Sequence, residues 1–476
     1  MKKIFLFLFA ALMSVSMFAA QTVVTINPSD LHNGTTCKKG GVTMTAAAID
    51  DVDAYITGPI SFSTELGKFI KIEIQAIGAY VEGEGWTGDN YKKTWTGKAS
   101  TVASTGNIST LGHITFTIEI PYAGEGTEES PYLISSAEEW NTLADKVNGG
   151  TTYSGVYFQL TDDIEISTMV GLSDHNFNGI FDGAGHTITA TLSSDAACCA
   201  PFAYTYGATI KNLHVTGTLT TSADHAGGVV GRNGSASLTL TNISCDMTIN
   251  STASNGGLVG YTINATLSGC AFTGKLLSET SRRIGGFVGW KSNTDGSYLT
   301  ITDCLFAPAE VTNGASNSKT FAVYGGGTVT ITNCYYTESI GSAQGKPALS
   351  ITGGSGVTVE NAGEPTEYTV SGITGYGVGI LYNSVLYGGW EDSIILYLSG
   401  YSAYSASAGT LSDNGDGTYT LSMLNTSVVI SGNSGPTGVE EVTGDRLQVT
   451  EKYLRNGILF INKDGKTYNA QGAVVK

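Results

Sequence analysis

The fold of this chain is decided by a short glycine-rich segment that occurs three times. It reads Gly227-Gly228-Val229-Val230-Gly231, returns as Gly256-Gly257-Leu258-Val259-Gly260, and occurs again as Gly285-Gly286-Phe287-Val288-Gly289. Successive copies begin 29 residues apart, and a less regular copy reads Phe321-Ala322-Val323-Tyr324-Gly325. Self-similarity at such a period is typical of a repeat architecture in which each repeat stacks on its neighbours.

A second strand-like segment accompanies each copy. Apolar and polar residues alternate in it, as in Leu238-Thr239-Leu240-Thr241, which is the pattern of a half-buried strand. These segments begin at residues 208, 238, 265, 299 and 329. A coil of this length holds about three short strands, and stacked coils lie about 4.8 Å apart. We therefore expect an all-β chain in which residues 122–362 form a right-handed parallel β-helix of roughly seven coils, with glycines at its positive-φ corners.

Aligning these segments produces two columns of equivalent residues. One column consists of Leu213, Ile243, Cys270, Cys304 and Cys334. Because cysteine replaces an aliphatic residue there, we expect a small buried hydrophobe, with a disulfide or a metal column as alternatives. The chain has seven cysteines and no Cys-x-x-Cys pair, which argues against a disulfide framework and a zinc knuckle. The other column predicts a turn-stabilising stack and consists of Asn212, Asn242, Gly269, Asp303 and Asn333.

Three further regions lack the repeat. Residues 21–121 contain runs of period two separated by glycine-rich turns and predict an N-terminal β-sandwich. Residues 363–434 predict a second small β-sandwich. Residues 435–476 begin with a Gly/Ser/Pro linker and continue as a short unit whose strands flank a hairpin turn at Asp464-Gly465.

One helix is expected, over residues 136–148. Ser136 and Glu139 have the spacing of a capping box at its start. A single apolar stripe follows at helical spacing, made of Trp140, Leu143, Ala144 and Val147. We expect this helix to cover the N-terminal end of the β-helix, because a terminal coil must be protected from solvent and from other sheet edges.

The N-terminus and the net charge restrict the setting and the partners. Residues 1–20 carry Lys2 and Lys3, an apolar run and small residues at the exit, so they predict a secretory signal peptide. No later segment has the roughly 18 consecutive apolar residues of a transmembrane helix. The formal net charge of −17 would repel phosphate backbones, so we expect no nucleic-acid partner.

Several segments resemble known families. The cores of the three glycine-rich copies resemble the GLUG repeat of bacterial surface proteins, over about residues 205–340, which implies an exported adhesin-like protein. Phe181-Asp182-Gly183-Ala184-Gly185-His186 is similar to the opening coil turn of pectate-lyase-like β-helices, and residues 364–431 look like sandwich modules of similar surface proteins. The ending Gly472-Ala473-Val474-Val475-Lys476 fits a Gly-x-x-Val-Lys pattern. Residues 439–476 thus resemble a divergent type IX secretion C-terminal sorting domain of the Bacteroidetes, which implies bacterial secretion machinery as a partner.

Catalysis would require a different set of residues. Glycoside hydrolysis uses two carboxylates about 5–10 Å apart. Among the acidic residues of 205–345, only Asp303 belongs to a repeated strand, and its counterparts are Asn or Gly. Asp182 with His186, and the loop Asp413-Asn414-Gly415-Asp416-Gly417, are better explained by turns than by an acid/base pair or a calcium loop. The sequence predicts no catalytic residue, no cofactor and no metal site.

Aromatic side chains are the remaining candidates for binding, since they can stack on sugar rings. We single out Trp86 and Trp95 in the N-terminal domain and Tyr335 on a late coil. For each, packing in the core or at an edge is the alternative. Tyr336 aligns with Phe272 and Phe306 in an inward ladder, so Tyr335 should point outward.

The function expected from the sequence is that of a secreted or cell-surface, adhesin-like protein. It would bind glycans or host surface and matrix components through the β-helix. Two alternatives stay open: a carbohydrate-active enzyme of the lyase or glycoside hydrolase type, and a purely structural stalk.

Overall fold

The computed structural model describes residues 21–433, except 65, 196–197, 253, 279–282 and 313–316, together with 451–455, 458–463, 466–469 and 474–475. The predicted signal peptide 1–20, the linker after residue 433 and the turn Asp464-Gly465 lie outside the described residues. The chain divides into two compact units, one ending at Asp145 with residues 155–162 added, the other formed by 146–154 and 163 onward. It is all-β with one α-helix in the described part, as predicted.

The first unit contains one continuous antiparallel sheet of ten strands, where two separate sheets were expected. Its longest strands, β6 and β10, pair with two register shifts, near Leu111 and Thr117. Such bulges bend and twist a strand, which lets one sheet turn over its own core of Phe62, Phe69 and Phe116. The strands are β1 (Gln21–Ile26), β2 (Gly34–Lys39), β3 (Val42–Asp50), β4 (Tyr55–Thr57), β5 (Ile60–Thr64), β6 (Lys68–Ala79), β7 (Trp86–Gly88), β8 (Lys92–Ala99), β9 (Thr101–Ser104) and β10 (Ile108–Glu119), with a 3-10 turn at Pro28–Asp30.

Helix α1 (Ala137–Asn148) starts at the predicted capping box, and its apolar stripe is buried as predicted. The Ser136 hydroxyl accepts a hydrogen bond from Glu139 N (3.3 Å), and the Glu139 carboxylate accepts one from Ser135 N (2.6 Å). The four residues of its apolar stripe are fully buried. At its end, Asn148 bonds the backbone of Met169 (3.3 Å) and Gly171 (2.8 Å) in the second unit. That the helix covers the end of the β-helix stays a prediction.

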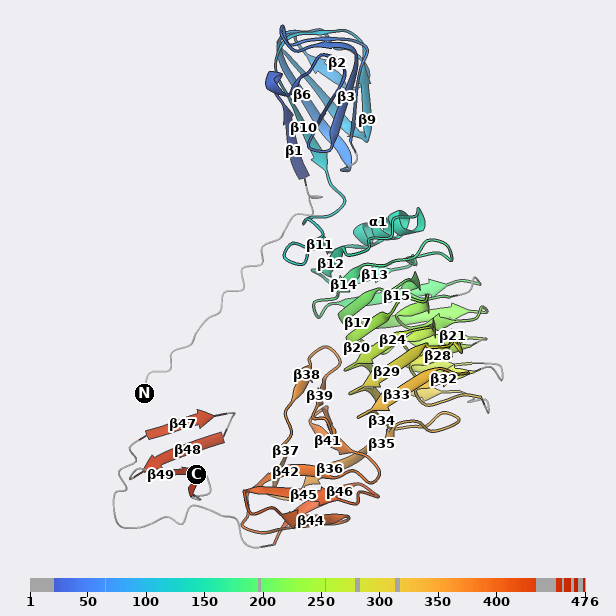
Figure 1. The fold of residues 1–476 in the computed structure, drawn as a ribbon, viewed down its shortest axis with the longest axis vertical. Coiled ribbons are helices and arrows are strands. Elements are labelled where there is room, and N and C mark those ends of the chain that lie inside the picture. Colours follow the sequence, from blue (N-terminus) through green and yellow to red (C-terminus); the bar gives the residue numbers. More distant parts are fainter. Residues whose placement is uncertain are drawn as a thin grey trace. The chain divides into compact units, whose positions relative to one another are not determined.

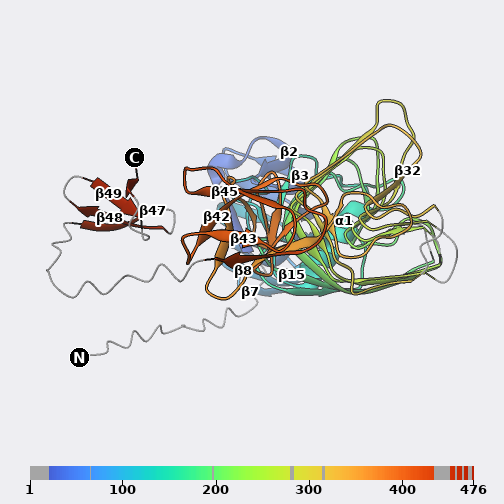
Figure 2. The same cartoon turned by 90° about the horizontal axis from the view of Figure 1, so that it is seen from below.

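The centre of the second unit is a β-solenoid of about seven turns, which confirms the predicted parallel β-helix (Figure 1). Its strands pair in parallel with the equivalent strands of the next coil, so the coils superimpose when viewed from below in Figure 2. A long first wall holds β13 (Ile164–Ile166), β14 (Ile180–Asp182), β15 (Thr187–Ser193), β17 (Thr209–Thr221), β20 (Leu238–Cys245), β21 (Thr248–Ser251), β24 (Ala265–Ser268), β25 (Ala271–Phe272), β26 (Lys275–Leu277), β29 (Tyr298–Thr302), β30 (Leu305–Phe306), β31 (Glu310–Val311), β33 (Thr328–Thr332), β34 (Tyr335–Tyr336) and β35 (Lys346–Pro347).

Two narrower sheets complete each coil. The five-stranded one, called the second wall here, consists of β16 (Phe202–Thr205), β19 (Val230–Asn233), β23 (Val259–Thr262), β28 (Val288–Lys291) and β32 (Ala322–Tyr324). The three-stranded one consists of β18 (Ala226–Gly227), β22 (Asn255–Gly256) and β27 (Ile284–Gly285). Ahead of the solenoid, in the first unit, β11 (Tyr132–Ile134) pairs in parallel with β12 (Tyr157–Leu160).

The glycine-rich copies lie at the bend between these two narrow sheets. Val229, Leu258 and Phe287 are fully buried and joined by backbone hydrogen bonds from coil to coil, so they occupy equivalent places. The glycines of the three copies do not have positive φ, contrary to expectation. They permit close approach instead: a Cβ on Gly257 would lie 2.2 Å from the carbonyl oxygen of Gly286 and 2.8 Å from the Phe272 ring.

The residues of the predicted asparagine column form corners of the solenoid, and their backbone has the left-handed conformation with positive φ. Asn212, Asn242, Gly269, Asp303 and Asn333 all have φ between 50° and 57°. Asparagine and aspartate tolerate this conformation better than other side chains. The stack is linked by hydrogen bonds, with Asn242 Nδ2 donating to Asn212 Oδ1 (2.9 Å) and Asn212 Nδ2 to Asp182 Oδ1 (3.0 Å). The predicted turn-stabilising stack is confirmed.

The cysteine column lies inside the solenoid, one residue after these corners. All seven cysteines are buried and unpaired. The thiols of Cys270, Cys304 and Cys334 each donate to the carbonyl oxygen two residues earlier, at 3.1–3.3 Å, and so bridge the corner residue. Burial raises the pKa of Cys304 far above its usual value. They are small core residues, as the sequence predicts, with a weak hydrogen bond added.

We expect these thiols to resist alkylation in the folded protein, because they are buried. Cys304→Val should lower the free energy of unfolding by less than about 1 kcal/mol, since it keeps an apolar side chain of similar size. Cys304→Ser should cost about 1–3 kcal/mol, because it buries a hydroxyl. Mass spectrometry after iodoacetamide treatment, with and without urea, and urea unfolding of both variants test this. Alkylation of native protein at Cys304 would contradict it.

A β-sandwich follows the solenoid directly. Its first strand starts at Leu349, earlier than the predicted boundary at 362/363, because the last solenoid strand continues into it after one residue. The two sheets share a core that includes Ile351, Leu396 and Ile430. One sheet holds β38 (Thr366–Tyr368), β39 (Ile373–Gly375), β40 (Ile380–Tyr382), β41 (Val385–Gly388), β36 (Leu349–Gly353), β46 (Val428–Gly432) and β43 (Tyr404–Ala406); the other holds β37 (Thr358–Asn361), β42 (Ile394–Ser399), β45 (Thr418–Ser422) and β44 (Thr410–Asp413).

The C-terminal segment contains a small antiparallel sheet of its own. Its strands are β47 (Glu451–Arg455), β48 (Ile458–Lys463), β49 (Lys466–Asn469) and β50 (Val474–Val475). Lys463 pairs with Lys466, so β48 and β49 are joined by two residues, which fits the predicted hairpin. Within the described residues, no helix has the length and apolar character needed to cross a bilayer.

Candidate functional site

Two of the three aromatic residues proposed from the sequence pack against the core of the first unit. Trp86 and Trp95 face each other across β7 and β8, and Trp95 is only 7% exposed. The Trp86 ring lies 6.3 Å from the ring of Phe62, between centroids. Trp95 has too little free surface to stack on a sugar. The alternative of core and edge packing describes both residues better.

The third, Tyr335, points away from the inside of the solenoid but is only 1% exposed, so its predicted exposure is wrong. The β-sandwich covers it: Tyr335 packs with Ile373 and Ile380 of β39 and β40. The inward ladder is confirmed, since Tyr336 pairs with Phe306, whose ring stacks on that of Phe272 at 5.9 Å. Apolar residues at the other outward positions of this column, Ala271 and Leu305, belong to the same buried cluster and mark the covered face.

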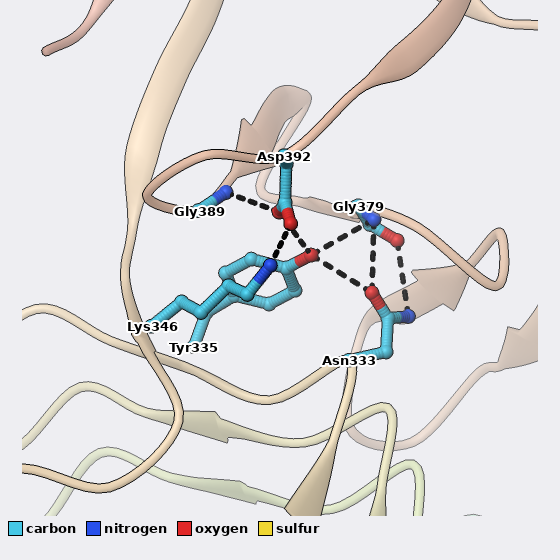
Figure 3. Close-up of polar contacts among 6 residues, drawn as sticks. All are labelled: Asn333, Tyr335, Lys346, Gly379, Gly389 and Asp392. Carbon is cyan, nitrogen blue, oxygen red and sulfur yellow. Dashed lines mark hydrogen bonds and ion pairs between the residues drawn. The ribbon is translucent and has the colours of Figure 1, made fainter. Parts of the chain in front are cut away.

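A polar network surrounds Tyr335 at this junction (Figure 3). Its hydroxyl lies 2.8 Å from Asn333 Oδ1 and 3.1 Å from Asp392 Oδ2, and accepts a hydrogen bond from Gly379 N (2.9 Å). Lys346 forms an ion pair with Asp392. Burial, and secondly the Asp392 carboxylate, raise the pKa of Tyr335. Every group is used in joining the sandwich to the solenoid, so the network has a structural role.

The hairpin of β38 and β39 extends this junction along the asparagine stack. Asn242 Oδ1 accepts hydrogen bonds from the backbone of Val370 (2.9 Å) and Ser371 (3.1 Å). Tyr368 donates its hydroxyl to Asp303 Oδ2 (3.2 Å). The column has glycine at position 269 because a Cβ there would lie 1.9 Å from the Tyr368 ring. Asp303 is 8% exposed and therefore unsuited to attack a polysaccharide.

The other chemical candidates are turns. Asp182 Oδ1 accepts from Ala184 N (2.8 Å), while His186 lies 3.4 Å from Asp163, so Asp182 and His186 do not form a pair. In the loop 413–417, Asp413 accepts from Gly415 N (2.8 Å) within the hairpin of β44 and β45. Within the described residues, no group of three His, Cys, Asp or Glu side chains could hold a metal ion.

A surface that sequence reasoning missed lies on the outside of the second wall. Its residues, called the outer column here, occupy neighbouring strands and are Tyr204, Arg232, Tyr261, Trp290 and Tyr324. The first four are in direct register, and a bulge in β28 offsets Tyr324 by one position. None of the five is buried, and Tyr324 is 39% exposed.

Cations lie over the rings of this column. The guanidinium carbon of Arg232 is 4.7 Å from the ring centroid of Tyr261, and that of Arg283 is 4.2 Å from Trp290. Lys319 Nζ is 4.9 Å from the centroid of Tyr324. We call Arg232, Arg283 and Lys319 the stacked cations. These distances are those of favourable cation–π contacts, which fix the position of flexible basic side chains.

A cleft of about 380 Å³ opens between the last two of these rings. It is lined by Arg283, Trp290, Asn317, Ser318, Lys319, Val323, Tyr324 and Ser342. A Cβ on Gly325 would come within 3.1 Å of the Trp290 ring, so this glycine leaves the space that the ring occupies. The adjacent Lys291 points inward, where its ammonium donates to the carbonyl oxygens of Ser297 (3.1 Å) and Gly326 (2.8 Å), and fixes the loops beside the cleft.

The electrostatics of the surface are unusual for so acidic a chain. None of the ion pairs among the described residues involves a stacked cation. His225 lies 5.0 Å from the Tyr261 ring, between centroids. Burial lowers its pKa most, and Arg232 and Arg283 lower it further, against an opposing effect of Asp224. The surface thus holds cations that have no ion-pair partner, with the carboxylate of Asp224 also near His225.

The sequence does contain a signal for this surface. The residue directly after each glycine-rich copy is Arg232, Tyr261 or Trp290. In each strand the next residue, Asn233, Thr262 or Lys291, is fully buried, so by alternation the residue before it faces outward. Aligning the copies one residue further would have revealed it.

No family model matches this chain, and no curated protein does either. Among solved structures, it is similar to a chain from Bacteroides ovatus described as a candidate immunoglobulin A1 protease. The identity is 18%, the match covers 47% of this chain and 83% of that one, and the TM-score is 0.33. At this level the likeness carries no conclusion about activity.

Proposed function

We propose that this chain is an exported, adhesin-like surface protein that binds glycans with the outer column of its solenoid. The observation that carries the proposal is the combination of rings and basic groups on one accessible wall: Tyr261, Trp290 and Tyr324, each beside a stacked cation. Such sites combine planar apolar area with polar donors, which suits carbohydrates. The resemblance to GLUG-repeat surface proteins favours the same function, and host surface or matrix components that carry glycans are the expected partners.

The proposal is tested by a glycan array probed with the mature protein, residues 21–476. Trp290→Ala should weaken binding to the best glycan at least about tenfold, because a central aromatic residue is lost. Trp390→Ala is the matched control, since Trp390 is 52% exposed on the sandwich and lies outside the outer column. Absence of binding to every glycan would favour a stalk, and release of sugar ends or unsaturated products would favour an enzyme.

Export through the C-terminal region is a second part of the proposal. Residues 438–476 would act as an address read by secretion machinery, in line with the resemblance to type IX sorting domains. The strands β47 to β50 pair only with one another among the described residues, as an independent unit requires.

Deleting residues 438–476 should leave the solenoid folded and retain the protein in the periplasm. Surface labelling and cell fractionation in the native host measure this, with protease resistance of the solenoid as the folding control. Normal surface levels of the truncated protein would contradict the sorting role.

A further inference from the structure

We infer that the outer column binds an acidic linear polysaccharide that lies along the axis of the solenoid. This inference rests on the function proposed above and specifies its ligand. The chemical groups recognised would be carboxylates carried at regular intervals on a glycan chain.

The rings of the outer column hold basic side chains on their faces. With a guanidinium 4.2 Å from its centroid, one face of Trp290 is occupied by Arg283 and is not free for a sugar. The rings therefore serve first to hold cations in place. Holding a long basic side chain beforehand reduces the entropy lost when it binds an anion, and a guanidinium offers two parallel hydrogen bonds to a carboxylate or sulfate.

The charges of the stacked cations are complementary to those of an anionic ligand. The chain has a formal net charge of −17, yet the stacked cations have no carboxylate partner among the described residues. Elsewhere on the solenoid, exposed lysines do have such partners: Lys211 pairs with Asp182 and Lys275 with Glu310. A neutral glycan would gain little from three uncompensated cations. An anionic glycan could bind these cations without breaking any existing ion pair.

The ring–cation pairs are spaced along the axis of the solenoid. Tyr261, Trp290 and Tyr324 lie on three successive coils, and adjacent strands are about 4.8 Å apart, so the three ring–cation pairs extend over roughly 10 Å along the axis. One step of this column is comparable to the length of one monosaccharide in an extended chain. Charges on consecutive sugars can then meet consecutive cations. Asn317 and Ser342, which are exposed and line the cleft, can bond the hydroxyls of the chain.

A nucleic acid fits this surface less well, although it is also a linear anion. Its affinity depends on many phosphate contacts and, for single strands, on bases stacked on open rings. The outer column offers three cations, and its rings already carry them.

The test uses the mature protein and three linear polyuronates, polygalacturonate, polymannuronate and polyguluronate, each beside its methyl ester. Esterification removes the charge and keeps the backbone. We expect at least one polyuronate to bind at least about tenfold more tightly than its ester, and its affinity to fall between about 0.05 M and about 0.5 M NaCl. With oligomers of that glycan, affinity should rise up to about three or four sugars and then level off.

Variants place the interaction on the column. Arg283→Ala and Lys319→Ala should each weaken binding about tenfold, with unchanged thermal unfolding. Lys275→Ala removes the same charge from the first wall, where it pairs with Glu310, and should leave the affinity unchanged. An equal loss in Lys275→Ala would show a general charge effect and overturn the inference.

Other outcomes separate this inference from the proposed function. If the esters bind as tightly as the acids, the glycan site stands and the acidic ligand is wrong. The same holds if none of the six polymers binds while the array still identifies a glycan ligand that Trp290→Ala weakens. Full competition by single-stranded DNA of equal charge would overturn the assignment to a glycan.

Discussion

Replacing Gly257 with valine is expected to lower the free energy of unfolding of the solenoid by about 3 kcal/mol or more. The added atoms have no room, because a Cβ alone would lie 2.2 Å from the Gly286 carbonyl oxygen and 2.8 Å from the Phe272 ring. The first contact is with backbone, which cannot move without breaking the hydrogen bonds that Gly257 N makes to the next coil. Urea-dependent pulse proteolysis of the protein measures the effect.

Gly326→Ala is the matched control for this experiment. A Cβ there would meet its nearest neighbour, Asn293 Cβ, at 3.4 Å, which is ordinary contact, and its φ is not positive. Its effect should stay within about 0.5 kcal/mol. If Gly257→Val and Gly326→Ala have equal effects, close approach of the coils is not the reason for the glycine-rich repeat.

Tyr335→Ala is expected to destabilise the attachment of the sandwich to the solenoid by about 3–5 kcal/mol. The substitution removes a buried ring that packs with Ile373 and Ile380, and a hydroxyl that bonds the backbone of Gly379. Tyr335→Phe keeps the ring and should cost only about 1–2 kcal/mol. Limited proteolysis, which should release the sandwich at lower urea in Tyr335→Ala, measures both.

The same variants test the earlier hypothesis that Tyr335 binds ligand. A buried structural residue should alter stability and leave glycan affinity of the folded protein unchanged. If Tyr335→Ala abolishes glycan binding while its urea midpoint equals that of the unsubstituted protein, Tyr335 belongs to the binding surface after all.

The prediction that Tyr335 is exposed failed because strand alternation gives the direction of a side chain but does not show whether another segment covers it. Strand alternation correctly separates Tyr335 from the inward ladder of Phe272, Phe306 and Tyr336. Whether an outward residue meets water depends on a segment about forty residues later, the strands β39 and β40. Nothing in the sequence near Tyr335 indicates where those strands pack.

The outer column was missed for a related reason. The glycine-rich copies are defined by the residues that repeat, whereas the proposed binding surface uses the position that varies among Arg232, Tyr261 and Trp290. The cations over these rings come partly from the loops before Ile284 and Phe321, and their contacts arise only when successive coils are stacked. Because these residues are far apart in the sequence, a short segment of the sequence does not show that they are in contact.

The sequence by itself determined the all-β class, the parallel solenoid, the buried cysteines and the asparagine corners, along with the helix and its capping box. These features follow from short-range rules, namely side-chain alternation, the steric freedom of small or amide side chains, and a period that brings equivalent residues into contact. Only the tertiary structure decided that the repeated glycines serve close approach, that the sandwich covers Tyr335, and that cations meet rings on the second wall. Each of these depends on the distance between segments remote in the chain, and such distances are set by packing of the whole unit.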